Sequence, residues 1–184
     1  MKVAFTGHRT YPNNDTLRLE SVIERLYREG YTHFVSGMAE GFDLAAAESV
    51  LRFKGQFPEI KLECAIPFDG HIERLSAPDR ERYKRVCQAA DKVTILATES
   101  HPKVYFDRND YLIEGADALI CYYSGNRRSG TGYTVIKGIK KGIRIINLYA
   151  DGVQIQFFGW FVLQPIKKSV IFERFLNSIN IYKL

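Results

Sequence analysis

The sequence predicts an α/β protein: a Rossmann-like three-layer sandwich built on a mainly parallel sheet of about six strands, followed by a C-terminal extension. Short apolar runs rich in strand-forming residues alternate with helical patterns from the first residue, which is typical of consecutive βαβ units. Polar turns that carry glycine follow several of the expected strands. The chain has 184 residues, and the alternating pattern accounts for one domain over residues 1–150.

Each element follows from a local pattern, in the order of the chain. The strands are short runs of β-branched, aliphatic and aromatic residues, and the helices are charged or Ala-rich stretches with apolar residues every three to four positions. Gly30 and Gly115 suit the ends of the first and fourth helices. The apolar face expected for the first helix is Leu17, Val22, Ile23 and Leu26. The expected strands are residues 2–6, 32–36, 62–68, 92–97, 117–123 and 143–149, and the later helices are 44–53, 79–90, 108–114 and 131–141.

Residues 151–184 differ in character and are expected to form a separate aromatic-rich extension. A dense apolar run at 155–163 is broken by Pro165, and the spacing after it is that of an amphipathic helix, so that a strand and a helix are expected. Such a tail must be covered by the domain's own sheet, by a partner such as a second copy in a homodimer, or by a membrane surface. The membrane is disfavoured because the helix is only weakly basic.

Composition excludes several classes of protein. Hydrophobic residues at 46% and charged residues at 26% are ordinary globular values, and the apolar stretches are far shorter than the roughly 20 residues that span a bilayer. Cys64, Cys87 and Cys121 are odd in number and widely spaced, which favours core thiols over a disulfide framework or a zinc site. With no apolar leader, the expected location is the cytoplasm.

The charge and histidine patterns point to an anionic small molecule rather than a metal. The formal net charge is +5, with the basic excess in the second half but no long basic cluster. Nucleic-acid binding is therefore open but not favoured, and a local anion site is preferred. No two histidines have metal-ligand spacing, so that the sequence identifies neither a metal site nor a resident cofactor.

Three glycine-bearing turns fall where the carboxyl ends of strands are expected, which is where open parallel sheets bind ligands. The first is residues 6–9, Thr-Gly-His-Arg, whose side chains suit a phosphate or a ribose. The second is residues 36–43, in which Asp43 suits either a ribose hydroxyl or a helix cap. The third, residues 129–132, opens a helix beside Arg127 and Arg128, a combination that suits an anionic group.

Other residues near these turns have two interpretations each. Asn109, beside Arg108, could bind the ligand or cap the helix expected to begin there, and Phe42 and Tyr133 could stack on a base or pack against the sheet. His8 lies in the first turn, whereas the other three histidines are isolated. Neither a G-x-G-x-x-G nor a P-loop motif is present, which disfavours a standard dinucleotide fold or a P-loop ATPase.

Six segments together resemble one family. These are Thr-Gly-His-Arg at 6–9, Ser-Gly-Met-Ala-Glu-Gly-Phe-Asp at 36–43, Ala-Ile-Pro-Phe at 65–68, Arg-Asn at 108–109, Ala-Asp at 116–117 and Ser-Gly-Thr-Gly-Tyr-Thr-Val at 129–135. In this order they resemble the YpsA branch of the SLOG superfamily, over about residues 1–149. The resemblance implies a Rossmann-like domain, shared with Lonely Guy phosphoribohydrolases and DprA single-stranded DNA-binding proteins, that binds a nucleotide or nucleotide-derived ligand.

The resemblance does not carry the Lonely Guy mechanism with it. Those enzymes use an Arg, which Arg108 matches, and a Glu in Pro-Gly-Gly-x-Gly-Thr-x-x-Glu, whose position here is Thr134. Threonine cannot serve as a carboxylate acid or base. Whether the chain is an enzyme is left open, leaning towards no. The weak catalytic candidates are Arg108, Glu40 and Asp43, with Asp107 as a further carboxylate in a neighbouring turn.

The expected function is therefore binding or sensing of a small nucleotide-derived ligand, with its phosphate at the third turn beside Arg108 and its ribose facing Asp43. One alternative is a nucleoside-monophosphate N-glycosidase with a rearranged carboxylate. Another is DprA-like binding of single-stranded DNA through Arg127, Arg128 and Lys140. The expected ligand-binding residues are Thr6, Gly7, His8, Arg9, Ser36, Gly37, Gly41, Asp43, Arg108, Asn109, Gly130 and Thr131.

Overall fold

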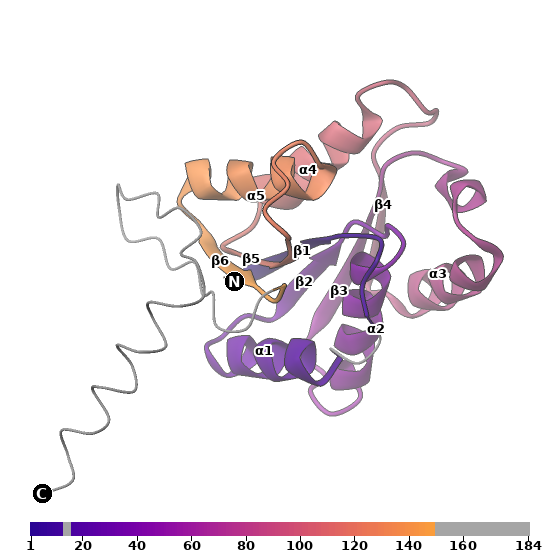
Figure 1. The fold of residues 1–184 in the computed structure, drawn as a ribbon. Helices are drawn as coiled ribbons and strands as arrows, with labels where there is room; N and C mark the ends of the chain where they lie inside the picture. The colour runs from indigo at the N-terminus through magenta and orange to yellow at the C-terminus, as the bar shows by residue number, and fades with distance from the viewer. Residues whose placement is uncertain (13–15, 150–184) are drawn as a thin grey trace, which may run out of the picture.

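Six parallel strands form a single sheet in the computed structural model, which describes residues 1–12 and 16–149 (Figure 1). The strand order across the sheet is β4-β3-β2-β1-β5-β6. The predicted α/β class and parallel sheet are therefore confirmed, whereas the extension predicted for 151–184 lies outside the described residues. The strands are β1 (Lys2–Gly7), β2 (His33–Ser36), β3 (Lys61–Ile66), β4 (Lys92–Ile95), β5 (Ala118–Tyr122) and β6 (Arg144–Asn147).

Helices cover both faces of this sheet and complete the predicted three layers (Figure 1). One face carries α1 (Thr16–Arg28) and α2 (Phe42–Lys54), and α3 (Ala77–Ala89) packs beside α2. The other face carries α4 (Val104–Glu114) and α5 (Gly130–Lys141), and a short 3-10 helix, η2 (His71–Arg74), lies between β3 and α3. Two hydrophobic clusters result, one on each face of the sheet.

The central strand β1 is buried on both faces, as expected for a parallel strand between two helical layers. Val3, Ala4 and Phe5 are fully buried. The Phe5 ring stacks on Phe34, with ring centroids 6.0 Å apart, and meets Phe42 edge-on at 6.4 Å. Phe42 is thus a core residue. Of its two interpretations, packing against the sheet is the correct one.

The strand order reverses beside β1. From β1 the chain adds β2, β3 and β4 in one direction and then returns to put β5 on the other side of β1. Thr6 and Gly7 of β1 pair there with Cys121 and Tyr122 of β5. The loops after these two strands leave in opposite directions, which opens a crevice at their carboxyl ends.

Several boundaries differ from the sequence-based expectation. Helix α1 buries Leu19, Ile23 and Leu26, whereas Leu17 is 79% exposed, so the predicted face was wrong at that residue. Strand β3 ends at Ile66 because Pro67 has no N–H to continue the ladder. Helix α4 begins at Val104, one turn before the predicted start at Arg108.

Among the described residues, no helix has both the length and the apolar character needed to cross a bilayer. The three cysteines are free thiols. Cys64 and Cys121 are buried, as predicted, and Cys87 is half-buried.

Candidate ligand-binding site

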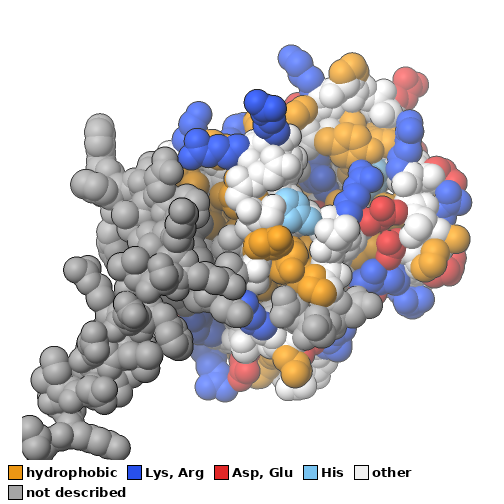
Figure 2. All heavy atoms as spheres, viewed as in Figure 1, with side chains coloured by type: hydrophobic (Ala, Val, Ile, Leu, Met, Phe, Trp, Pro, Cys, Tyr) orange, Lys and Arg blue, Asp and Glu red, His pale blue; other side chains and the backbone are white. Residues whose placement is uncertain are grey.

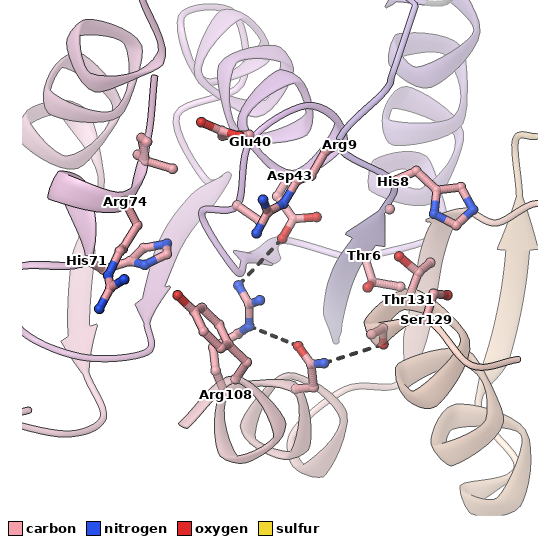
Figure 3. Close-up of a pocket in the computed structure, with 16 residues that line it drawn as sticks. Thr6, His8, Arg9, Glu40, Asp43, His71, Arg74, Arg108, Ser129 and Thr131 are labelled. Atoms are coloured by element: carbon pink, nitrogen blue, oxygen red, sulfur yellow. Dashed lines mark hydrogen bonds and ion pairs between the residues drawn. The ribbon is translucent and has the colours of Figure 1, made fainter. Parts of the chain in front are cut away.

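The crevice at the carboxyl ends of β1 and β5 holds a cavity of about 310 Å³ (Figure 3). This volume is at the lower end of the range for small-molecule pockets. Most of the predicted ligand-binding residues line it, although they come from three separate turns and from α4. The predicted residues in its wall are Thr6, Gly7, His8, Arg9, Asp43, Arg108, Asn109, Gly130 and Thr131, and Glu40 lines it as well.

A buried ion pair forms the floor of the cavity. Nη1 of Arg108 lies 3.7 Å from Oδ2 of Asp43, and the two side chains are 8% and 5% exposed. Arg108 also donates to the Gly37 carbonyl and, through Nε, to Oδ1 of Asn109 at 2.9 Å. Asn109 in turn donates to the Gly130 carbonyl at 3.4 Å. This chain of contacts ties the second turn, α4 and the start of α5 together (Figure 3).

The position of α4 also decides what Arg108 and Asn109 do. Because the helix begins at Val104, both residues lie in its second turn and face the sheet rather than cap the helix. The alternative that Asn109 is a cap is therefore wrong. The guanidinium of Arg108 is held by three partners, so that it acts as a fixed buried cation.

Three of the predicted residues lie behind the cavity wall and shape it. The Ser36 hydroxyl donates to the Asp43 carbonyl at 2.8 Å and accepts from the Met38 N–H, which closes the second turn. A Cβ at Gly37 would overlap the guanidinium of Arg108. Gly41 has a φ of 78° and is the N-cap of α2, so that Asp43 lies inside the helix rather than capping it.

Burial dominates the electrostatics of the ion pair. It raises the pKa of the Asp43 carboxyl to about 6, although Arg108 and the backbone at Ala39 and Gly7 act in the opposite direction. Burial also lowers the pKa of Arg108, which remains a cation because its ordinary value is so high. Oδ1 of Asp43 is buried and has no hydrogen-bond partner within the described ranges, and the residue is part of the cavity lining.

The first helical turn of α5 forms one end of the cavity. Ser129 is the N-cap, and its hydroxyl accepts from the Gly132 N–H at 2.9 Å. The N–H groups of Gly130 and Thr131 donate to no residue that the structure describes. Free amides at a helix N-terminus favour an anion, and the Thr131 side chain lines the same place.

His8 and Arg9 of the first turn lie at the rim. The Ser124 N–H donates to Nε2 of His8 at 3.0 Å, and burial lowers the pKa of the imidazole, so that His8 is neutral at pH 7. Its ring lies against Tyr122, Tyr123 and Tyr149. Arg9 is exposed and forms no ion pair or hydrogen bond with any described residue.

Sequence reasoning missed the other end of the cavity. His71 and Arg74 of η2 line it together with Leu75 and Tyr105. The His71 side chain was interpreted as isolated, but the loop after β3 reaches the same sheet edge as the three glycine-bearing turns, a signal that could have found it. Ala39 and Ser129 also line the cavity; they belong to two of the predicted turns but were not among the expected ligand-binding residues.

His71 is buried with both ring nitrogens lacking a hydrogen-bond partner in the described part of the chain. The ring contacts Phe68, Tyr83 and Tyr105. Burial, together with the cations Arg108, Arg9 and Arg74, lowers its pKa to about 4, while the Met38 carbonyl acts in the opposite direction. His71 is therefore neutral at pH 7.

The remaining candidates lie away from the cavity. Thr134, at the position of the Lonely Guy Glu, is fully buried and donates back to the Gly130 carbonyl at 3.0 Å. Asp107 is exposed, 3.5 Å from His101. Tyr133 donates to Asp110 at 2.8 Å and packs against Phe106, so that it does not face the cavity.

Comparisons with known proteins agree with this fold. DprA from Streptococcus pneumoniae superposes with a TM-score of 0.57 at 21% identity, covering 79% of this chain and 49% of that one. DprA from Helicobacter pylori, described with a single-stranded DNA binding mode, gives 0.57 at 17% identity, covering 80% and 64%. This chain thus spans about half of the first DprA chain and 64% of the second, and at such identities the likeness shows the fold alone.

The sequence comparisons are more specific. A UPF0398 protein of Bacillus cereus strain B4264 is 27% identical over 153 residues, covering 76% of this chain and 83% of that protein. The profile of the YspA SLOG family matches residues 16–146, which include two of the three glycine-bearing turns and the Arg108–Asn109 pair. The chain therefore belongs to the YspA SLOG family, as the resemblance of its motifs indicated.

Proposed function

We propose that this protein binds a small nucleotide-derived ligand in the cavity at the carboxyl ends of β1 and β5. The observation that carries the proposal is the convergence, at the reversal of strand order, of free helix N-terminal amides with a buried, fixed cation in one cavity. Parallel sheets bind nucleotides at this place, and helix N-termini bind their phosphates. The family membership supports the same class of ligand.

The contacts suggest how such a ligand lies. Its phosphate accepts from the amides of Gly130 and Thr131 and from the Thr131 hydroxyl, which stay free within the described residues. Its ribose lies over the floor, where Oδ1 of Asp43 accepts from a hydroxyl. Arg108 is already bound to three protein groups, so that its role is to neutralise and position Asp43 rather than to grip the phosphate.

Thermal unfolding against AMP, ADP, ADP-ribose and NAD tests the proposal. A ligand at about 100 times its dissociation constant adds about 2.7 kcal/mol, which raises the Tm by several degrees. The variant is Thr131→Val, which removes a cavity hydroxyl with little change of shape. The matched control is Thr134→Val one turn along α5, where the hydroxyl is bonded within the helix and lies outside the cavity.

We expect the shift to weaken in Thr131→Val, since a hydrogen bond to a charged group contributes about 1.5–3 kcal/mol. Thr134→Val should bind as the unaltered protein does. No shift with any of the four compounds, in protein first freed of copurified nucleotide, would contradict the proposal. Equal weakening in both variants would place the ligand elsewhere.

A further inference from the structure

The cavity has two ends that differ in chemistry and lie on opposite sides of the Arg108–Asp43 floor (Figure 3). One end is the first turn of α5, with Ser129 and Thr131. The other is formed by η2, with His71 and Arg74. A single phosphate at the α5 end would leave the groups of the η2 end without a ligand.

His71 is the reason to assign a ligand group to the η2 end. A buried polar side chain normally has a hydrogen-bond partner, because leaving one unpaired costs free energy. The Met38 carbonyl lies near the His71 ring, but neither ring nitrogen has a well-aligned hydrogen-bond partner among the residues described, although the residue is only 5% exposed and its side chain points into the cavity (Figure 3). Three aromatic rings hold the imidazole in this orientation.

The charges around His71 determine whether the ligand group at this end is an anion or a cation. Arg74 comes from η2 and Arg9 from the first turn, and neither forms an ion pair or hydrogen bond with a residue that the structure describes. The two carboxylates on this side are already engaged. Asp43 pairs with Arg108, and Glu40 accepts the Ser76 N–H at 2.6 Å. Glu40 keeps its negative charge, but it forms no ion pair with Arg9 or Arg74, so that two unpaired cations face one carboxylate at this end and the balance favours an anion.

Resting on the proposed function, we propose that the η2 end is a second phosphate subsite formed by His71, Arg74 and Arg9. The ligand of this cavity then carries two phosphate groups separated by its ribose, as a nucleoside 3′,5′-bisphosphate does. One phosphate lies on the amides of Gly130 and Thr131, and the ribose lies over Asp43. The second phosphate accepts from the His71 ring and from the two arginine side chains, which close over the mouth.

Calorimetric titration with AMP, adenosine 3′,5′-bisphosphate and ADP tests this subsite. ADP carries the same two phosphates as the bisphosphate but joins them directly, so that it distinguishes separated from adjacent phosphates. The variants are Arg74→Ala and His71→Asn. The matched control is Arg85→Ala on α3, which removes another exposed positive charge, one that lies outside the cavity.

We expect the bisphosphate to bind the unaltered protein at least about tenfold more tightly than AMP, since charge-assisted hydrogen bonds of this kind are each worth that factor or more. The ratio of the two affinities should fall to about threefold or less in Arg74→Ala and in His71→Asn, and stay unchanged in Arg85→Ala. The affinity for ADP should exceed that for AMP by a smaller factor than the affinity for the bisphosphate does.

Three results would overturn the subsite. They are equal affinities for AMP and the bisphosphate, a ratio that survives Arg74→Ala, and an ADP gain as large as that of the bisphosphate. In each case AMP still binds, so that the proposed function stands. If none of the three nucleotides binds, the subsite fails, and the proposed function fails with it when ADP-ribose and NAD give no thermal shift either.

Discussion

Arg108 of α4 and Asp43 of α2 form an ion pair across the carboxyl edge of the sheet, 3.7 Å apart and shielded from solvent. The two residues are 65 positions apart in sequence and belong to helices on opposite faces of the sheet. The pair therefore joins the two helical layers at the place where the cavity opens. Its energetic and chemical consequences can be measured separately.

Removing one partner should destabilise the fold. Arg108→Ala leaves the Asp43 carboxylate, the Gly37 carbonyl and Oδ1 of Asn109 without their donor, and breaking a buried pair in this way costs about 3–5 kcal/mol. Urea unfolding should show this loss. Arg128→Ala, at an exposed position, should change stability by no more than about 0.5 kcal/mol.

Adding Asp43→Ala to Arg108→Ala gives a second check on the ion pair. The double variant no longer buries an unpaired carboxylate, so that it should recover part of the unfolding free energy lost in Arg108→Ala. Additive losses in the double variant would show that the two side chains do not interact.

The pH dependence of stability should reveal two opposing groups. The pKa of His71 falls from 6.5 to about 4 on folding, so the unfolded chain binds the proton first and stability declines as the pH drops from 6.5 to 4. The pKa of Asp43 rises from 3.8 to about 6, so the folded chain binds the proton first and stability declines as the pH rises from 4 to 6. The two slopes oppose each other over nearly the same range.

Single variants should separate these slopes. In His71→Asn the Asp43 slope remains, and stability relative to the unaltered protein should fall as the pH rises from about 4 to 6. In Asp43→Asn the His71 slope remains, and stability should rise over that interval. Denaturant unfolding in steps of half a pH unit measures both. Curves for His71→Asn and the unaltered protein that run parallel from pH 4 to 6.5 would rule out titration of His71.

Gly37 should be intolerant of a side chain. A Cβ there would overlap the guanidinium of Arg108 and lie 2.8 Å from Oδ2 of Asp43, so that Gly37→Ala should cost about 1–3 kcal/mol. Gly55→Ala is the matched control. Its φ is −62° and a Cβ there meets only the Arg52 carbonyl at 3.4 Å, so that stability should stay equal or rise by up to about 1 kcal/mol. Equal effects of the two changes in urea unfolding would contradict the close contact.

We expect no release of free adenine when the protein is incubated with AMP. The residue at the position of the Lonely Guy Glu is Thr134, which is buried and bonded back to the Gly130 carbonyl. Of the cavity carboxylates, Asp43 is paired with Arg108 and Glu40 accepts from Ser76. Chromatography of the reaction measures the base directly. Release that disappears in Glu40→Gln or Asp43→Asn would instead establish an N-glycosidase with a rearranged carboxylate.

Binding of single-stranded DNA should be weak and steeply dependent on salt. Arg127 and Arg128 are exposed just before α5 begins, and Lys140 is exposed in its last turn, so that the three charges are spread over the length of the helix. We expect an oligonucleotide to be retained at low salt and released by about 200 mM, as binding through phosphate contacts alone requires. Retention at 200 mM that is lost when these three residues are changed to Ala would support a DprA-like role.

The sequence predicted most of the elements that carry the cavity, because strand and helix patterns are local. Apolar runs such as residues 2–6 and glycine turns such as 129–132 identify strands and helix starts from neighbouring residues alone. Parallel pairing then puts all the turns at one edge, so that Thr6, Asp43 and Thr131 could be assigned to one site without coordinates. The family follows from the same motifs.

The boundaries and partners could not be obtained in this way. The sequence pattern put Arg108 and Asn109 at the start of a helix. Because α4 begins at Val104, both residues lie in its second turn and face the sheet. Sequence spacing contains no signal for the pairing of Arg108 with Asp43, because it depends on how helices on opposite faces meet at the edge.

His71 illustrates the same limit from the other direction. His71 is an isolated histidine in a loop, and the neighbouring sequence indicates no role for it. Its place in the cavity became visible only from the three aromatic rings that bury it and from the cavity lining. The sequence by itself determined the fold class, the family and the edge of the sheet where the cavity lies, since these rest on local periodicity and short motifs. The tertiary structure alone decided which charges are paired and which are free, because burial and distance are properties of packing.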